Sequence, residues 1–344
     1  MSFDLSLLGV RKNIPKVNFT DYTGIFIAEP KFGKTTMASK FPNSIIVPFE
    51  DGAKGQVANV VEKLNNWDDF IEFVDKLEEY REEIGTSIQT IVFDTVNKAY
   101  DMCESYTLRK LSFLDKKNYQ KPNDVPHGGF YPARDKYFSL QLDRISRLGF
   151  TMLFLSHSKV KTIRPKDGEA YDVYSSTMPE RLEAIINPLV DFIIYGERRV
   201  IDGVRTRVLV TKGNEMTATG NRVYMNEDIP FESEEEAMQK YQELFRKQIE
   251  NRLADEGITE DVDSIAKRQQ EEKMSKVKEY LEQEKTKSVD DYKEEIDEII
   301  SNLSTEKKKE LQAAFVSKVG DAKYKSSEDT EKLKKYLEVA KSVK

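Results

Sequence analysis

The sequence predicts an α/β protein with a mostly parallel sheet, followed by a charged helical region. Apolar runs of strand length alternate with amphipathic helical segments, and a phosphate-binding motif follows the first run. After about residue 231, glycine and proline nearly vanish while Glu, Lys, Gln and Asp become frequent. We therefore expect an α/β core at residues 1–231 and a charged α-helical region at residues 232–344.

The composition describes a soluble and highly charged protein. The chain has 344 residues, of which 33% are charged and 38% are aliphatic or aromatic, enough for one large or two modest domains. The formal net charge is -7, so a nucleic-acid site has to be a local basic patch. The single cysteine, Cys103, excludes an intramolecular disulfide and argues against a cysteine-rich metal site.

The sequence predicts neither a secretory signal nor a membrane span. Its first residues lack the basic start and apolar run of a secretory signal. No stretch approaches the roughly 20 apolar residues of a membrane span. We expect a cytoplasmic protein with no membrane partner.

The motif that organises the chain lies at residues 28–35. Its sequence, AEPKFGKT, matches the phosphate-binding loop G-x-x-x-x-G-K-[ST] except at the first glycine. Gly33 allows backbone amides to turn towards phosphates, Lys34 supplies a positive charge for the β- and γ-phosphates, and the Thr35 hydroxyl is placed to ligate Mg²⁺. We expect the nucleotide to contact the whole loop and the helix start: Glu29, Pro30, Lys31, Phe32, Gly33, Lys34, Thr35 and Thr36.

The residues on either side of this motif support it. Apolar residues 25–27 predict a buried strand before the loop, and residues 37–40 predict a helix after it, whose N-terminus faces the phosphates. Ala28 replaces the first glycine and tolerates a positive φ poorly, which leaves the geometry of the turn open. The alternative is a chance match in an ordinary strand, turn and helix.

The second predicted strand, residues 44–49, leads directly to Glu50 and Asp51. Carboxylates at the end of a strand beside the phosphate loop lie in the ligand crevice of an α/β sheet. We expect Glu50 to orient or deprotonate the attacking water, with Asp51 as its substitute. The alternative is a polar turn, because Asp-Gly is a common turn pair.

The third predicted strand, residues 87–95, follows an amphipathic helix at residues 65–83 and contains Asp94 near its end. An apolar strand ending in Asp downstream of a phosphate loop has the form of a Walker B segment. In such a segment the carboxylate supports Mg²⁺, often through a water molecule. Asp94 is therefore our second metal-binding candidate, beside Thr35.

The fourth predicted strand, residues 149–158, follows a helix at residues 137–148 and ends in polar side chains. A polar side chain at this edge of the sheet can contact the γ-phosphate and respond to its presence. We expect His157 to be this sensor. The alternative is a structural histidine.

Two basic segments are candidate surfaces for single-stranded nucleic acid. Residues 112–136 follow a helix at 97–111 that contains Cys103, and they mix Lys and Arg with Tyr and Phe. Such a mixture suits backbone neutralisation together with base stacking. Residues 159–182 begin with basic residues, and we expect them to form a long irregular loop at the ligand edge of the sheet. The alternative for the first segment is a solvated loop between helices.

Two further strand-like runs, residues 189–195 and 206–211, predict a hairpin near the edge of the sheet. Lys212 and Arg222 follow it. Cations at these positions can reach a nucleotide bound to a neighbouring subunit, as arginine fingers do. The alternative is ordinary surface charge.

The helical region shows sparse apolar residues at helical spacing, most clearly between residues 290 and 303. We expect helices with a thin core and no catalytic constellation. This region is a candidate for recruiting a replication or recombination protein.

The ordered set of motifs resembles the RecA-like ATPase core, and more specifically the compact phage-encoded RecA-like proteins of the single-strand-annealing recombination group. The resemblance covers roughly residues 15–230. It rests on the stretches AEPKFGKTTMASKFPNSIIVPFEDG, TIVFDT, GGFYPARDKYFSLQLDRI, LFLSHSKVKT and LVTKGNEMTATGNR. The phosphate loop is specific for nucleotide binding, whereas the other stretches are specific only as a set.

The resemblance implies ATP as substrate, Mg²⁺ as cofactor, single-stranded DNA as partner and the cytoplasm of a host cell as location. It also implies a homo-oligomer in which Lys212 and Arg222 act across a subunit interface. The resemblance further implies that His157 couples the γ-phosphate to the loop that follows it, which would change shape with the nucleotide state. This sequence has His where the resemblance leads us to expect Gln.

Two other functions stay open at this level. One is a nucleotide-switched interaction protein that recruits a partner through its helical tail with little turnover. The other is a small-molecule kinase, which the lack of a compact arginine-rich lid disfavours. Stimulation of ATP hydrolysis by DNA distinguishes the recombination ATPase from both.

Overall fold

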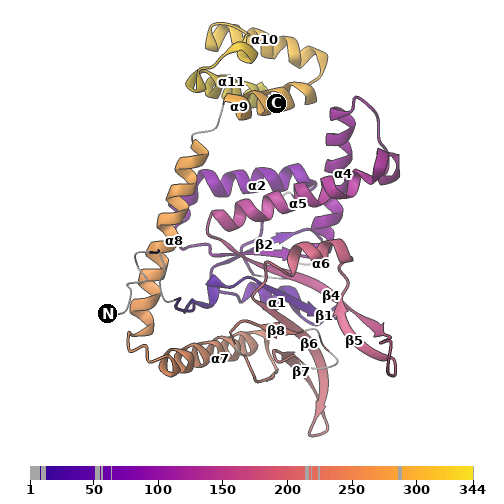
Figure 1. Cartoon of the computed structure of the whole chain (residues 1–344), viewed down its shortest axis with the longest axis vertical. Helices are drawn as coiled ribbons and strands as arrows, with labels where there is room; N and C mark the ends of the chain where they lie inside the picture. The colour runs from indigo at the N-terminus through magenta and orange to yellow at the C-terminus, as the bar shows by residue number, and fades with distance from the viewer. Residues whose placement is uncertain are drawn as a thin grey trace. The chain divides into compact units, whose positions relative to one another are not determined.

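The computed structural model (Figure 1) describes residues 13–50, 57–62, 64–213, 219–223, 225–285 and 289–343, together with Leu8, Gly55 and Thr217. Contacts between residues divide the chain into two compact units, Met1–Ser275 and Lys276–Lys344. Each unit is described by itself. Among the described residues, no helix is long and apolar enough to cross a membrane.

One mixed sheet forms the centre of the first unit. Its main path runs in the order β2-β3-β4-β1-β6-β7-β9, with β5 paired to β4 and β8 paired to β6. The five strands from β2 to β6 along this path are parallel, and the others are antiparallel. The strands are β1 (Gly24–Ala28), β2 (Ser44–Pro48), β3 (Thr90–Asp94), β4 (Thr151–Ile163), β5 (Tyr171–Ser176), β6 (Phe192–Ile201), β7 (Val204–Val210), β8 (Gly220–Asn221) and β9 (Ile229–Phe231).

The register of the parallel strands brings the candidate side chains to one edge. Ala28 at the end of β1 lies beside His157 on β4 and Gly196 on β6. Asp94 at the end of β3 lies beside Pro48 on β2. Because the parallel strands run in the same direction, the phosphate loop, the residues after β2, Asp94 at the end of β3 and His157 on β4 converge at one edge of the sheet.

Helices cover both faces of the sheet, since neighbouring residues of a strand face opposite sides. Val92 and Leu153 belong to an apolar cluster with residues of α1 and α7. On the opposite face, the rings of Phe93 and Phe154 lie 5.1 Å apart, and Phe70 of α2 packs edge-on against Phe93. The helices of this unit are α1 (Lys34–Ser39), α2 (Trp67–Glu79), α3 (Arg81–Ile84), α4 (Val96–Leu114), α5 (Phe130–Arg147), α6 (Glu180–Ile186) and α7 (Glu234–Asp255), followed by α8 (Val262–Lys285).

Trp67, the only tryptophan of the chain, begins α2 and lies inside the first unit. The Asn66 side chain caps this helix by accepting the backbone N–H groups of Asp68 and Asp69. The indole is 1% exposed and stacks on Phe138 of α5 at 5.4 Å. Its Nε1 has no hydrogen-bond partner among the described residues. Trp67 therefore fixes α2 against α5 by apolar contact alone.

Helix α7 packs on the α/β core, although its composition resembles that of the tail. Ser233 caps it by accepting the N–H of Glu236. Its apolar face, which includes Tyr241 and Phe245, joins the same cluster as β1 and α1. Residue composition thus places the start of the helical region at 232, whereas contacts extend the first unit to Ser275. The apolar face of α7 explains the difference as far as Asp255, because glutamate and lysine on its exposed side mask this face in a compositional scan.

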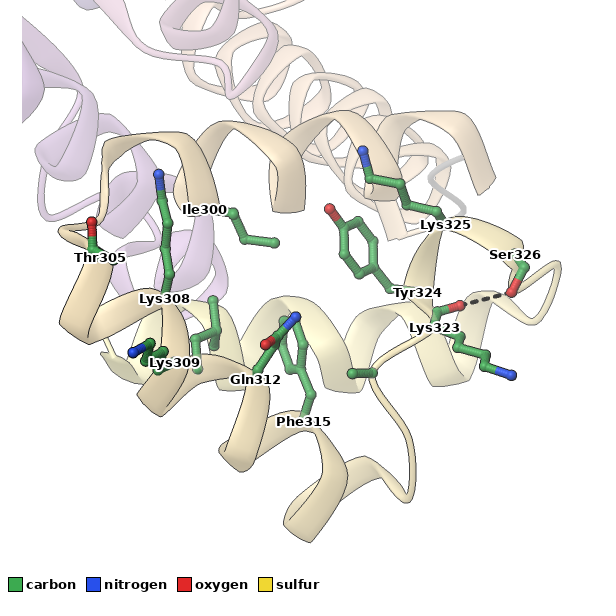
Figure 2. Close-up of a pocket in the computed structure, with 12 residues that line it drawn as sticks. Ile300, Thr305, Lys308, Lys309, Gln312, Phe315, Lys323, Tyr324, Lys325 and Ser326 are labelled. Atoms are coloured by element: carbon green, nitrogen blue, oxygen red, sulfur yellow. Dashed lines mark hydrogen bonds between the residues drawn. The ribbon is translucent and has the colours of Figure 1, made fainter.

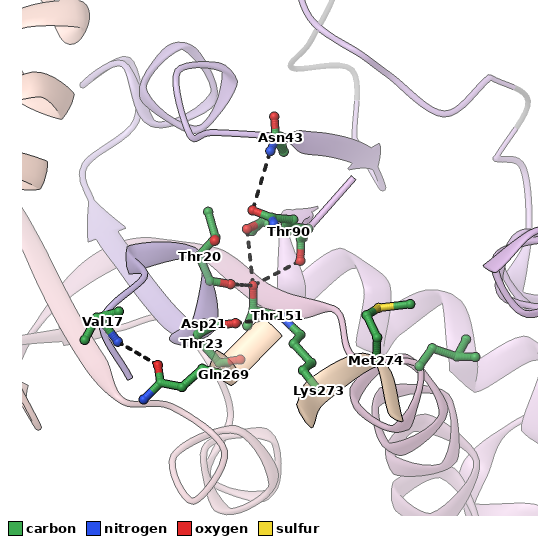
Figure 3. Close-up of polar contacts among 12 residues, drawn as sticks. Val17, Thr20, Asp21, Thr23, Asn43, Thr90, Thr151, Gln269, Lys273 and Met274 are labelled. Carbon is green, nitrogen blue, oxygen red and sulfur yellow. Dashed lines mark hydrogen bonds and ion pairs between the residues drawn. The ribbon is translucent and has the colours of Figure 1, made fainter. Parts of the chain in front are cut away.

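Polar contacts attach the first part of α8 to the same unit (Figure 3). The Gln269 side chain accepts the N–H of Val17 at 3.1 Å. It also donates to the Pro15 carbonyl at 2.9 Å. One turn later, Lys273 pairs with Asp21 at 2.7 Å. Segments more than 250 positions apart are thereby joined.

Within the second unit, α9 (Val289–Asn302), α10 (Thr305–Val319) and α11 (Thr330–Val343) form a core of their own. Ser304 caps α10, and Gly320, with φ of 101°, ends it in the left-handed conformation. Phe315 of α10 and Tyr336 of α11 pack edge-on at 5.0 Å. The buried residues of this core are Tyr292, Ile296, Ile299, Leu303, Leu311, Phe315, Tyr324, Leu333, Tyr336, Leu337, Val339 and Ala340.

Candidate nucleotide-binding site

The phosphate loop connects β1 to α1 and contains two residues with positive φ. These are Lys31 at 62° and Gly33 at 110°. Ala28 is the last residue of β1 and is fully buried in extended backbone. Alanine therefore does not obstruct the turn, because the left-handed positions lie further along the loop. The first N–H groups of α1 have no acceptor within the helix and are available to phosphate oxygens.

The Phe32 side chain anchors the loop in the core. It is 1% exposed, and a Cβ at Gly196 would lie only 2.5 Å from its ring. Glycine at position 196 is thus needed for the close approach of β6 to the loop. Of the predicted contacts with nucleotide, Phe32 can contribute only its backbone.

Two arginines of the β6–β7 hairpin hold the outer side of the loop. Arg198 pairs with Glu29 and donates to the Lys31 carbonyl at 3.3 Å. Arg207 donates to the Phe32 carbonyl at 3.2 Å and to Glu234, the first residue of α7, at 2.5 Å. Sequence analysis missed this anchoring, because no local pattern indicates that residues some 170 positions apart meet.

Lys34 is the central cation of the site and is 6% exposed. Its Nζ donates to the carbonyls of Ala28 and Glu29, each at 3.0 Å, and lies 3.0 Å from His157 Nδ1. Burial lowers the pKa of Lys34 from 10.5 to about 8, although the carboxylates of Asp94 and Glu50 oppose this shift. The position of the ammonium group thus depends on both the loop and the neighbouring strand.

Thr35 and Asp94 form the pair expected for a metal. The Thr35 hydroxyl donates to Asp94 Oδ2 at 2.6 Å. Asp94 is 2% exposed, and this burial raises its pKa, although the Thr35 hydrogen bond acts in the opposite direction. A buried carboxylate beside a hydroxyl fits Mg²⁺, which usually takes one or two protein oxygens and completes its shell with water and phosphate. No described group of three or more His, Cys, Asp or Glu side chains could hold a metal by itself.

Glu50 and His157 complete the cluster. The backbone N–H groups of Phe49 and Glu50 both donate to the Asp94 carbonyl, at 2.8 and 3.2 Å, which fixes the end of β2 beside β3. Glu50 Oε1 lies 3.5 Å from His157 Nε2. When Lys34 is charged, its ammonium group has only donors, so His157 Nδ1 is the acceptor in this contact. The structure therefore joins Glu50, His157 and Lys34 in one chain of polar contacts.

The structure brings Lys34, Thr35, Glu50, Asp94 and His157 together, as the sequence predicts. Their individual roles remain predictions. Asp51, the alternative to Glu50, lies outside the described residues. Cys103 is buried within α4, and burial raises its pKa to about 12.

Lys212 and Arg222 lie at the opposite edge of the sheet, where the parallel strands begin. Lys212 follows the end of β7, which runs antiparallel to β6. Arg222 pairs with Asp191 at 2.9 Å, and Asp191 also accepts the N–H of Thr23, just before β1. Neither cation can therefore serve the phosphate loop of its own chain, and a role across a subunit interface remains a prediction.

The segment after β4 differs from the irregular loop that we expected. Strand β4 continues past His157 to Ile163 and pairs with β5 in an antiparallel hairpin, in which Val160 lies beside Tyr174. Its exposed residues include Lys159, Lys161 and the half-exposed Tyr171. The alternation of lysine with Val160 and Thr162 supports a strand better than a loop.

Residues 112–136 present fewer aromatic rings than the sequence suggests. Tyr119 and Phe130 are buried with Val125 in a small cluster of their own. Arg134 is 9% exposed and lies 3.9 Å from the centre of the Tyr100 ring. These rings are therefore unavailable for base stacking, although Phe113 is 45% exposed.

The strand order and the polar cluster define a P-loop ATPase with a RecA-like core and a helical appendage. Residues 20–223 match the AAA domain family, and the chain belongs to this family.

Among solved structures, the chain is similar to a KaiC-like protein from the hyperthermophilic archaeon Pyrococcus horikoshii. The TM-score is 0.34 and the identity 12%, over 64% of this chain and 89% of that one. A comparison with curated proteins found no match.

Proposed function

We propose that this chain is a phage-type ATPase that acts on single-stranded DNA in recombination or replication, in the single-strand-annealing group of RecA-like proteins. One observation carries the proposal. The strand that holds His157 against Lys34 continues without interruption into the exposed β4–β5 hairpin.

The hairpin has features that suit a nucleic-acid strand. Lys159 and Lys161 alternate along β4 and therefore lie on the same face. Arg164 and Lys166 continue the positive charge towards the turn, and Tyr171 is 48% exposed. Exposed cations beside an aromatic ring can neutralise phosphates and stack on a base. Lys159 and Lys161 lie two and four positions after His157 on the same strand, so a change at His157 on nucleotide binding would reach them along β4.

Two observations support a homo-oligomer in this proposal. Lys212 and Arg222 lie at the sheet edge opposite the phosphate loop of their own chain, where a second copy's nucleotide could be reached. The tip of the β6–β7 hairpin exposes Val200 and Val204 by 74% and 64%, respectively. Exposed apolar side chains gathered at one tip are typical of a protein interface.

The first test measures ATP hydrolysis by the purified protein with and without single-stranded DNA. We expect DNA to raise the rate, and Lys34→Ala to abolish it. The paired change Lys159→Ala with Lys161→Ala should remove the DNA stimulation and leave the basal rate intact. Lys116→Ala with Lys117→Ala tests the other basic segment, and Lys334→Ala with Lys335→Ala controls for loss of charge.

A rate that depends on Lys34 but not on DNA would contradict the DNA role. It would favour the second candidate, a nucleotide-switched interaction protein that recruits a partner. The observation favouring that candidate is the second unit, which has a core separate from the ATPase core. A further measurement then compares partner binding in ATP and ADP.

A further inference from the structure

We propose that the second unit binds a short acidic peptide with apolar side chains, contributed by a partner protein, in a groove along α10. The groove consists of two adjoining hollows, of about 580 and 560 Å³, that share Lys309, Gln312 and Ala322. Figure 2 shows the larger one, between α10 and the segment around Tyr324.

The charge of the groove is one-sided. Its described lining includes Lys308, Lys309, Lys323 and Lys325, and no carboxylate. Residues 276–344 contain 16 Lys against 16 Asp and Glu, so this excess does not follow from the composition of the unit. Lys325 pairs with Asp297 at 3.0 Å, whereas no ion-pair partner is found in the described chain for the other three. Several unpaired cations in a concave site attract an anionic ligand.

The lining also has an apolar component. Ile300, Leu311 and Ala322 line the larger hollow, and Ala313 lines the smaller one beside Val316, which is 55% exposed. A ligand that covers this exposed valine removes apolar surface from water, which favours binding. The ligand should therefore carry aliphatic or aromatic side chains as well as carboxylates.

The aromatic residues distinguish a peptide from single-stranded nucleic acid. Phe315 and Tyr324 line the groove but are only 2% and 7% exposed. The bases of a single-stranded nucleic acid bind to a protein groove largely by stacking on exposed aromatic rings. Without an available ring face, the groove suits an acidic peptide better than a DNA strand.

The test selects short random peptides, displayed on a carrier, on the immobilised full-length protein. We expect the selected sequences to combine Asp and Glu with apolar residues. The binding of a labelled selected peptide is then measured by fluorescence anisotropy, with a twin in which Asn and Gln replace the acids. The twin should bind at least about tenfold more weakly, because the attraction depends on charge.

Two charge-reversed variants locate the site. Lys308→Glu with Lys309→Glu should weaken the binding of the acidic peptide by about tenfold or more. Lys334→Glu with Lys335→Glu makes the same change at two exposed positions of α11 outside the groove, and it should leave binding nearly unchanged. Val316→Asn tests the apolar half without a change of charge and should weaken binding several-fold. Thermal unfolding by circular dichroism checks that each variant folds.

Three outcomes would overturn the proposal. The selection yields no acidic consensus, the peptide binds both charge-reversed variants equally, or a labelled oligothymidylate binds in the groove instead. The last result would identify the groove as a nucleic-acid site, which Lys308→Glu with Lys309→Glu would reveal by loss of DNA binding. None of these outcomes depends on ATP hydrolysis, so the proposal fails or survives separately from the proposed function.

Discussion

At the scale of single residues, Lys34 joins the loop to the neighbouring strand, and its burial has a measurable consequence. Its pKa of about 8 lies below the ordinary 10.5. In the folded chain without nucleotide, Lys34 therefore loses its proton as the pH rises through about 8, whereas the unfolded chain keeps it to higher pH. Anionic phosphates stabilise the ammonium form and raise the pKa again.

We therefore predict that nucleotide binding takes up a proton near pH 8. The uptake should approach about half a proton per site there and decrease as the pH is lowered towards 7, where Lys34 is already charged. Isothermal titration calorimetry in two buffers of different ionisation enthalpy measures it. An uptake that is absent at pH 8, or equal at both pH values, would contradict the shifted pKa.

The burial of Asp94 in the same cluster lowers the stability of the folded state. Burial raises its pKa, so the folded state disfavours its ionised form and loses stability as the pH rises above the ordinary value of 3.8. We predict that Asp94→Asn increases the free energy of unfolding at pH 7 by about 1 kcal/mol and abolishes hydrolysis. Urea unfolding without nucleotide measures the first effect.

The increase in the free energy of unfolding caused by Asp94→Asn should become smaller as the pH falls towards 4, because the wild-type carboxyl group then becomes neutral too. Asp101→Asn, at an exposed position of α4, is the control and should change stability little. Equal effects of the two substitutions would show that burial of the charge is not the cause.

At the scale of elements, the sequence predicts the parallel strands well. Apolar runs at 25–27, 44–49, 87–95, 149–158 and 189–195 correspond to β1, β2, β3, β4 and β6. These strands are buried on both faces, so their sequences are continuous apolar runs. The hairpin arm β5 was missed because Tyr171 and Asp172 are exposed, and a strand with two polar faces lacks this signal.

The candidate site was predictable to the same extent. Lys34 and Glu50 closely follow the ends of β1 and β2, Asp94 ends β3, and His157 lies on β4 beside the end of β1. Topology brings these positions to one edge of the sheet, so position in the chain was sufficient. The arginines that hold the loop were not predictable. Arg198 and Arg207 act through long-range contacts with loop carbonyls, and a charged residue on an edge hairpin looks like ordinary surface charge.

The anchoring role of Arg207 gives a prediction at this scale. Arg207→Ala removes its hydrogen bonds to the carbonyls of Phe32 and Glu232 and its pair with Glu234. We expect the loop to lose order and the apparent affinity for ATP to fall by about tenfold. Arg205→Ala changes an exposed arginine of the same strand and should have little effect. Equal KM values for the two variants would contradict the anchoring role.

At the scale of the whole molecule, the two units have separate apolar cores. We predict two transitions in differential scanning calorimetry of the full chain, because cooperative unfolding follows the limits of a core. Phe315→Ala should destabilise one transition by about 3–5 kcal/mol and leave the other in place. Phe154→Ala, in the sheet, should affect the other transition. A single transition that both variants lower would contradict independent cores.

The position of Trp67 makes the two units optically distinct. Tyrosine in both units absorbs in the ultraviolet, but the only indole of the chain lies in the first unit. It is stacked on Phe138, and its N–H has no partner in the part of the chain that the structure describes. Emission excited at the red edge of the absorption band therefore reports on the ATPase core alone, whereas far-ultraviolet ellipticity reports on both units. During unfolding, we expect the emission of Trp67 to shift from short to longer wavelength in a single step, while the ellipticity changes in two steps. Comparing the two curves would identify which unit unfolds first without any label.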